Sequence, residues 1–124
     1  MIFGYIQNKR NEKRLRKLNE SRPNLTRTEY INRLVKSGFE KQHAEVVHDE
    51  IREFIQMDDF SIYPEDDIHE IYRIEEIDDI ELIDEICKKL NLRKVEQKDC
   101  DELNKKTRNF NAEFILTLTR NLAE

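Results

Sequence analysis

The chain has 124 residues, of which 40% are charged and 37% hydrophobic, and its formal net charge is −5. This length suits one domain with a modest core, and the presence of only two glycines and two prolines argues against a β architecture with many turns. Its two cysteines, Cys87 and Cys100, are too few for a disulfide framework and favour a reducing, cytoplasmic setting.

Charge is unevenly distributed along the sequence. Residues 1–27 hold eight Lys and Arg against two Glu, a net charge of +6, whereas the other 97 residues hold 14 basic and 25 acidic side chains, a net charge of −11. An acidic body repels the phosphates of DNA and favours basic protein partners. No apolar run approaches the roughly 20 residues that span a bilayer. The basic N-terminal segment could still contact a membrane surface, RNA or the protein's own acidic face.

Two helices are predicted at the start of the chain. Residues 5–20 are rich in strong helix formers, and their apolar side chains are so sparse that this helix is expected to be peripheral or to pair with another chain. Thr26 and Glu29 have the spacing of a capping box, which would begin a short helix over about 27–37. Gly38 stands where a left-handed cap would end that helix.

The middle of the chain predicts a long helix, a loop and a second long helix. Residues 40–57 carry apolar side chains at i, i+4, i+7 and i+8, which form one core stripe. Pro64 breaks this period, and the loop around it combines solvated acidic residues with apolar ones that we expect to lie against the core. Residues 77–90 are again helical, with an apolar seam at i, i+3, i+7 and i+10, and Asn91 can cap their C-terminus.

Two further helices are predicted to close the chain. A brief one covers about 99–107, and a last one covers 112–122, where an apolar stripe follows a possible N-cap at Asn111. No segment alternates between apolar and polar residues with a period of two. The predicted fold class is therefore all-α.

The segment at 77–90, IDDIELIDEICKKL, resembles the second helix of acyl carrier proteins. In that family Asp-Ser-Leu is typically followed by a run such as Asp-x-Val-Glu-Leu-Val, and the matching positions here are Ile77, Asp78, Ile80, Glu81, Leu82, Ile83 and Leu90. The approach IYPEDDIHEIYRI resembles the proline-containing loop before that helix. The resemblance covers about residues 40–122. It implies a small orthogonal helical bundle over 40–124, preceded by an extra N-terminal helical region over 1–39.

The resemblance stops at the attachment point of the carrier's prosthetic group. A carrier holds phosphopantetheine on a serine at the start of the second helix, whereas here Glu75, Glu76 and Ile77 replace Asp-Ser-Leu and Glu76 takes the serine's position. A carboxylate cannot accept that phosphodiester, and no Ser or Thr occurs between Ser61 and Thr107. In a first helical turn, negative charge is instead favoured by about 0.3–1 kcal/mol. The sequence therefore predicts a carrier-like scaffold without phosphopantetheine.

The spacing of residues does not support a metal site or a reactive cysteine. His43 and His48 are five positions apart, so they do not stack on one helix face as metal ligands at i and i+4 would. The acidic loop lacks the alternating ligands and the glycine of a calcium-binding loop. Cys87 lies in a predicted core seam, where an apolar environment raises the pKa of a thiol. We therefore expect no metal, no cofactor and no enzymatic activity.

The acidic surface of the carrier-like helix remains as a candidate docking face. In carrier proteins the equivalent face binds basic patches on partner enzymes, so the resemblance implies a basic protein partner here; the alternative is a merely solvated surface. The docking residues are predicted to be Glu75, Glu76, Asp78, Asp79, Glu81, Asp84 and Glu85.

Three functional hypotheses follow from the sequence. The first is an unmodified, non-enzymatic interaction module that self-associates through residues 1–20. A second is an acidic immunity-type or antitoxin-type inhibitor of a basic toxin, which only the composition supports. The third is a genuine carrier that uses an unrecognised serine.

Overall fold

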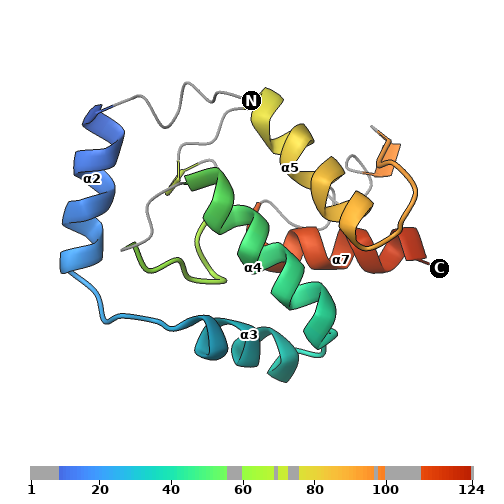
Figure 1. Ribbon diagram of the computed structural model, residues 1–124, viewed down its shortest axis with the longest axis horizontal. Helices are drawn as coiled ribbons and strands as arrows, with labels where there is room; N and C mark the ends of the chain where they lie inside the picture. Colours follow the sequence, from blue (N-terminus) through green and yellow to red (C-terminus); the bar gives the residue numbers. More distant parts are fainter. Residues whose placement is uncertain are drawn as a thin grey trace.

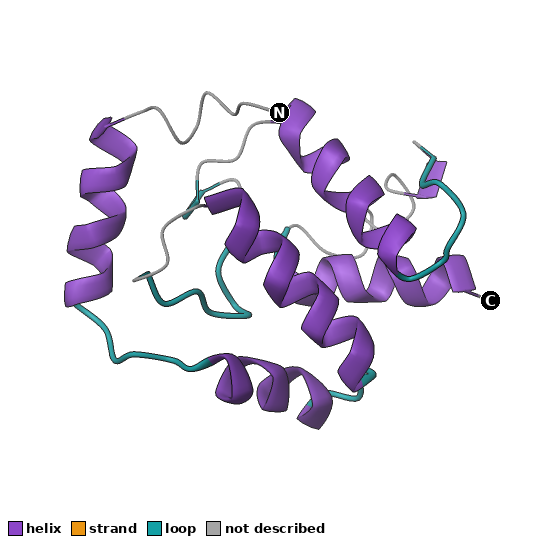
Figure 2. Cartoon of the chain, viewed as in Figure 1, coloured by secondary structure: helices purple, strands orange, loops and turns teal. Residues whose placement is uncertain are grey.

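The computed structural model describes residues 9–55, 60–68, 70–72, 76–96, 98–99 and 110–123, and within them it leaves out the side chains of 9–12, 76–80 and 123. It contains the helices α2 (Lys9–Glu20), α3 (Arg27–Lys36), α4 (Lys41–Ile55), α5 (Glu76–Lys89) and α7 (Ala112–Ala123) (Figure 1). These ranges hold no strand (Figure 2), so the prediction of an all-α fold is confirmed. Among the described helices, none is both long and apolar enough to cross a membrane.

The predicted helix bounds agree with the observed ones to within about two residues wherever the structure describes them. The helix predicted over 27–37 is α3, and the one predicted over 112–122 is α7. Residues 5–8 of the helix predicted over 5–20, and residues 56–57 of the helix predicted over 40–57, lie outside the described residues. The brief helix predicted over 99–107 also lies outside them, apart from Asp99.

Helix α4 is the centre of the arrangement. It packs against α3, α5 and α7, and these helices do not share a common direction (Figure 2). Figure 1 places α2 at one end of the long axis of the molecule, with α5 and α7 on the opposite side of α4. The two charge-rich helices, basic α2 and acidic α5, are therefore separated by the core helix.

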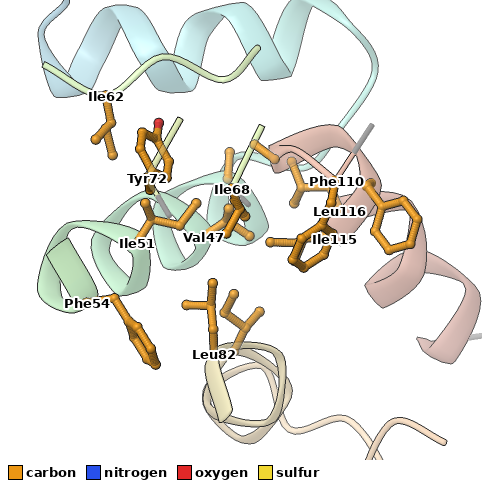
Figure 3. Packing of buried hydrophobic residues seen from close by; sticks show 14 of the residues in the cluster. Val47, Ile51, Phe54, Ile62, Ile68, Tyr72, Leu82, Phe110, Ile115 and Leu116 are labelled. Atoms are coloured by element: carbon orange, nitrogen blue, oxygen red, sulfur yellow. The ribbon is translucent and has the colours of Figure 1, made fainter. Parts of the chain in front are cut away.

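One hydrophobic core includes residues from every described helix. Figure 3 shows Val47 of α4, Leu82 of α5 and Ile115 of α7 gathered around the same centre. Leu15 of α2 is only 1% exposed and belongs to this cluster, and Leu18 packs against it. The sequence predicted that this first helix is peripheral or pairs with another chain; in the structure Leu15 is buried within the chain itself, and Leu18 is partly buried. The predicted segments 1–39 and 40–124 thus share one core.

Side chains at two helix starts act as N-caps, as predicted. Thr26 Oγ1 accepts a hydrogen bond of 3.2 Å from the amide of Glu29, and Glu29 Oε1 accepts one of 3.0 Å from the amide of Thr26. Asn111 Oδ1 likewise accepts a 3.0 Å hydrogen bond from the amide of Phe114 at the start of α7. These bonds satisfy amides that have no partner within their own helix.

Two helices end in a left-handed residue. Gly38 after α3 has φ of +100°, and Asn91 after α5 has φ of +61°; among the described residues, only these two have positive φ. The next amides, of Phe39 and Leu92, each donate to the carbonyl oxygen five residues earlier, at 3.1 and 2.8 Å. This is the Schellman arrangement, which satisfies the last carbonyls of a helix. Both positions were predicted as caps.

The connection between α4 and α5 lies against the core, as its apolar content predicted. We call its described residues, 60–68 and 70–72, the α4–α5 loop. Phe60, Ile62, Ile68 and Tyr72 are each at most 1% exposed. The amide of Ile68 donates to the carbonyl of Phe110 at 2.8 Å, which ties the loop to the approach of α7.

Candidate functional site

The predicted docking residues belong to α5, with the exception of Glu75, which lies outside the described residues. Glu76 is the first residue of α5. This helix therefore begins with a glutamate and not with a serine. For Glu76, Asp78 and Asp79 the structure describes the backbone only. The geometry of the predicted face can therefore be followed at Glu81, Asp84 and Glu85.

These three carboxylates share the outer face of α5. Their spacing of i, i+3 and i+4 places them on one side of a helix, whereas the opposite side is buried through residues such as Leu82 and Ile86. Glu81, Asp84 and Glu85 are all partly exposed. One oxygen of Asp84 is nevertheless buried, without a hydrogen-bond partner among the described residues. The face is thus acidic, but its middle carboxylate is only partly open to solvent.

Helix α4 adds carboxylates beside α5. Glu50 is buried and accepts a hydrogen bond from Lys89 Nζ at the end of α5. This hydrogen bond raises the pKa of Lys89, and the charges of Glu50, Glu53 and Glu85 act in the same direction. Lys89 thus pairs mainly with Glu50, whereas Nζ of Lys88 lies 3.5 Å from Oε1 of Glu85 and partly offsets the negative charge of the outer face.

The most completely built polar site lies elsewhere, on the α4–α5 loop. Arg22 donates hydrogen bonds from Nη1 and Nη2 to Oδ1 and Oδ2 of Asp66, each at 2.8 Å, and its Nη2 also donates to the carbonyl of Ser61 at 2.7 Å. The guanidinium carbon lies 4.1 Å from the ring centre of Tyr63 and 5.4 Å from that of Phe60. The side chains of Arg22 and Asp66 are only 17% and 8% exposed. We call this arrangement the Asp66 site.

Further donors hold the carboxylate of Asp66 in place. Its Oδ2 accepts hydrogen bonds from the hydroxyl of Tyr72 at 2.8 Å and from the amide of Tyr63 at 3.1 Å. Burial, followed by the negative charge of Asp66, raises the pKa of Tyr72. Burial alone would lower the pKa of Arg22, but its hydrogen bonds to Asp66 and the charge of that carboxylate outweigh this effect, so the pKa is raised. The site therefore keeps a guanidinium cation against a fixed anion.

Tyr30 of α3 adds an incompletely satisfied group nearby. Its side chain is 1% exposed, and its hydroxyl has no hydrogen-bond partner among the described residues. Burial and then the charge of Asp66 raise the pKa of this hydroxyl. Nε of Arg22 is likewise buried without a partner in the part of the chain that the structure describes. The Asp66 site is thus strongly but not fully satisfied.

Several contacts beside Arg22 join residues 13–25, which we call the N-terminal arm, to the α4–α5 loop. The amide of Ser61 donates to Asn19 Oδ1 at 2.9 Å, and the amide of Leu25 donates to Ser61 Oγ at 3.3 Å. Three more hydrogen bonds run from Arg14 to the Ile71 carbonyl, from Tyr63 to the Pro23 carbonyl and from Ser61 to the Asn24 side chain. Together with buried Leu15 and Leu25, they fix the arm along the loop.

These contacts bear on the idea of an unrecognised carrier serine. Ser61 is 3% exposed, and its hydroxyl bonds to Asn24 and accepts from the amide of Leu25. A modifying enzyme would have to displace the N-terminal arm before it could reach that oxygen. In this conformation Ser61 is therefore a structural residue.

The histidines and cysteines do not converge on a site in the described structure. His48 is buried, with Nδ1 2.8 Å from Asp49 Oδ1 and its ring edge-on to Tyr30. His43 Nε2 lies 3.5 Å from a carboxylate of Glu40. Cys87 is buried, while His69 and Cys100 lie outside the described residues. Within the described ranges, no three His, Cys, Asp or Glu side chains are arranged to hold a metal ion.

Sequence reasoning missed the Asp66 site. It interpreted Arg22 as one of eight basic N-terminal residues and Asp66 as part of a solvated acidic loop, but Asp66 is buried and bonded. Asp67 of the same loop accepts a 3.0 Å hydrogen bond from the amide of Phe110, so it too has a structural role. The only local signal was an aspartate set among aromatic residues, and nothing in the sequence links it to an arginine 44 positions away.

Comparisons of the chain with protein-family models, with curated proteins and with solved structures found no match. The similarity to acyl carrier proteins therefore rests on the residue pattern at 77–90 and on the order of the predicted helices.

Proposed function

We propose that this protein is a non-enzymatic interaction module that presents the acidic face of α5 to a basic protein partner and carries no phosphopantetheine. The observation that carries the proposal is the placement of Glu81, Asp84 and Glu85 on one outer face, opposite the buried stripe of the same helix. Interaction surfaces of this kind act mainly by speeding the encounter with a partner and by selecting its charge.

The charge of α5 and its surroundings supports this assignment. The helix has six acidic and two basic residues. Of the two lysines, Lys89 is bonded to Glu50, and Lys88 lies 3.5 Å from Glu85, so the acidic residues of α5 remain in excess. A surface with such an excess of one charge attracts a basic partner over several ångströms, and the attraction weakens as salt is added. We therefore expect the interaction to be strongly salt-dependent.

Two features support the absence of phosphopantetheine. Glu76 stands at the first position of α5, where a carrier would present its serine. Ser61, the nearest serine or threonine upstream, is buried and bonded to the N-terminal arm. Incubation with coenzyme A and a broad-specificity phosphopantetheinyl transferase should leave the mass of the protein unchanged, and a gain of one phosphopantetheine would refute this part of the proposal.

Affinity purification from the native host tests the docking face directly. The wild-type chain should recover a basic protein at low salt, and the double variant Glu81→Lys, Glu85→Lys should lose it. The matched control, Glu70→Lys with Glu113→Lys, makes the same charge change at exposed positions outside α5 and should keep the partner. Equal recovery by both variants would contradict the proposal.

The same experiment separates the competing hypothesis. If the partner recovered is a basic nuclease toxin that the protein inhibits, the protein is an acidic immunity-type or antitoxin-type inhibitor that uses the same face. Self-association through residues 1–20 stays a separate prediction, since the structure describes only residues 9–20 of that segment and buries Leu15 within its own chain.

A further inference from the structure

Helix α2 has one side packed against the rest of the chain and one side facing outward. The inner side carries Leu15, which is 1% exposed, and Leu18, which packs against the core. At the two edges of that side, Arg14 and Asn19 hydrogen-bond to backbone atoms of the α4–α5 loop. These contacts fix the rotation of α2 about its own axis, so they also decide which of its residues point away from the core.

The outward side of α2 is basic. Lys13, Arg16 and Lys17 are exposed, and their spacing of i, i+3 and i+4 places them on one face, opposite the two leucines on the helical period of 3.6 residues. We call these three residues the basic face. Glu20, which is also exposed on this side, offsets one of their charges. Positive charge remains in excess, because α2 has six basic and two acidic residues in all.

The residues directly before α2 in the sequence are mostly apolar. Five of the eight, in MIFGYIQN, are large apolar or aromatic residues, namely Met1, Ile2, Phe3, Tyr5 and Ile6. An apolar segment beside a basic helix face combines the two attractions that hold a protein on an anionic membrane surface. Either attraction alone gives weak and reversible binding, whereas the two together give a stable attachment.

We propose that the basic face of α2, together with residues 1–6, binds the surface of an anionic lipid bilayer. The cations contact the lipid headgroups, and the apolar residues enter the boundary between the headgroups and the acyl chains. A bilayer fits better than a nucleic acid, because one convex side of a helix matches a flat charged surface, whereas single-stranded nucleic acids are bound in grooves with aromatic stacking platforms. Aliphatic residues such as Ile2 and Ile6 add affinity for lipid but none for a phosphate backbone.

The position of α2 in the fold gives this contact an orientation. Figure 1 places α2 at one end of the long axis of the molecule, with α5 on the opposite side of α4. Residues 28–124 have a net charge of −11, so an approach to anionic lipid through the acidic helix α5 would be repelled. Contact through α2 instead turns α5 away from the lipid. The proposal goes beyond the function proposed for the acidic face and does not depend on it.

Cosedimentation of the full-length chain with lipid vesicles tests the contact. The wild type should bind vesicles of phosphatidylcholine and phosphatidylserine at least about tenfold more tightly than vesicles of phosphatidylcholine alone. Lys13→Glu with Lys17→Glu should lose this preference. The matched control is Lys36→Glu with Lys41→Glu, at exposed positions of α3 and α4. Both double variants have a net charge of −9, four units below the −5 of the wild type, but the control should keep the preference because its basic face is intact.

A second variant and a second ligand separate lipid from nucleic acid. Phe3→Ser with Ile6→Ser keeps the basic face and should weaken binding to the anionic vesicles by at least about tenfold, because it removes the apolar attraction. Fluorescence anisotropy with a single-stranded RNA oligomer should show weaker binding than that to the anionic vesicles. Equal wild-type binding to the two kinds of vesicle, an equal loss in the control variant, or tighter binding to the RNA would overturn the proposal.

Discussion

Arg22 and Asp66, 44 positions apart, form a bidentate pair in which both side chains are largely buried. This pair joins the basic N-terminal arm to the loop before α5, and it brings the two oppositely charged parts of the sequence together at one point. Among the described residues most charged side chains are at least partly exposed, and an exposed ion pair contributes little to stability. The burial of this pair makes it different, since a partner left alone there would be an uncompensated charge.

Removing one partner of this pair should therefore be costly. Asp66→Ala is expected to lower the free energy of unfolding by about 3–5 kcal/mol, because it leaves the Arg22 guanidinium buried without its anion. The control is Glu65→Ala, which removes the neighbouring carboxylate from an exposed 2.7 Å pair with Arg33 and should cost about 0.2–1 kcal/mol. Urea denaturation measures both values, and equal losses would show that the buried pair adds nothing special.

The burial of Leu15 gives a second prediction. Leu15→Ala should lower the free energy of unfolding by about 2–5 kcal/mol, because it leaves a cavity in the core. Val35 of α3 is 41% exposed, so Val35→Ala should change stability by no more than about 0.5 kcal/mol. A peripheral α2 would instead make the leucine substitution as mild as that of Val35.

The left-handed end of α3 gives a third prediction. Nothing lies within 4 Å of the position that a Cβ of residue 38 would occupy, so the effect of Gly38→Ala reports on the backbone alone. With φ at +100°, the substitution should cost about 1–2 kcal/mol in thermal or urea denaturation. Asn91→Gly, at the equivalent position after α5, should be neutral or slightly stabilising. A more stable Gly38→Ala protein would mean that residue 38 does not adopt this conformation in solution.

The buried histidine predicts a pH dependence. Burial lowers the pKa of His48, and the hydrogen bond to Asp49 acts in the opposite direction without overcoming it. Since the unfolded chain has a histidine pKa of about 6.5, the unfolded state binds more protons than the folded state just below that pH. The free energy of unfolding should therefore be fully retained above about pH 6.5 and should fall as the pH drops below it.

Substitution of His48 isolates its share of this effect. His48→Phe keeps an aromatic ring beside Tyr30 and should flatten the pH dependence of urea denaturation between about pH 5 and pH 6.5. Hydrogen bonds from Arg27 lower the pKa of Asp49, so that carboxylate stays ionised over this range and adds no slope of its own. An unaltered slope in His48→Phe would show that His48 is not the titrating group.

The sequence predicted the features that depend on residues close together in the chain, above all the helix ends. Thr26 and Glu29 are three positions apart, and the caps at Gly38 and Asn91 depend on one residue each, so local pattern was sufficient for the helix ends. The common face of Glu81 and Glu85 follows from helical spacing in the same way. The partial burial of Asp84 could not be predicted, because it depends on how the helices pack around α5.

The Asp66 site could not be predicted from local patterns in the sequence. Its parts come from the arm and from several points of the α4–α5 loop, and no periodicity relates them. Charged residues make up 40% of the chain, so the presence of one arginine and one aspartate does not single out this pair. Their pairing is decided only when the core places the loop beside α2.

The distance along the chain between the arm and its binding loop has a consequence for biosynthesis. Arg22 emerges from the ribosome 44 residues before Asp66, a delay of about 2–9 s at a typical elongation rate of about 5–20 residues per second. During that interval the bidentate contact that holds the arm against the loop cannot form. Nascent or truncated polypeptides that end before residue 66 are therefore expected to be the species most exposed to proteases and chaperones.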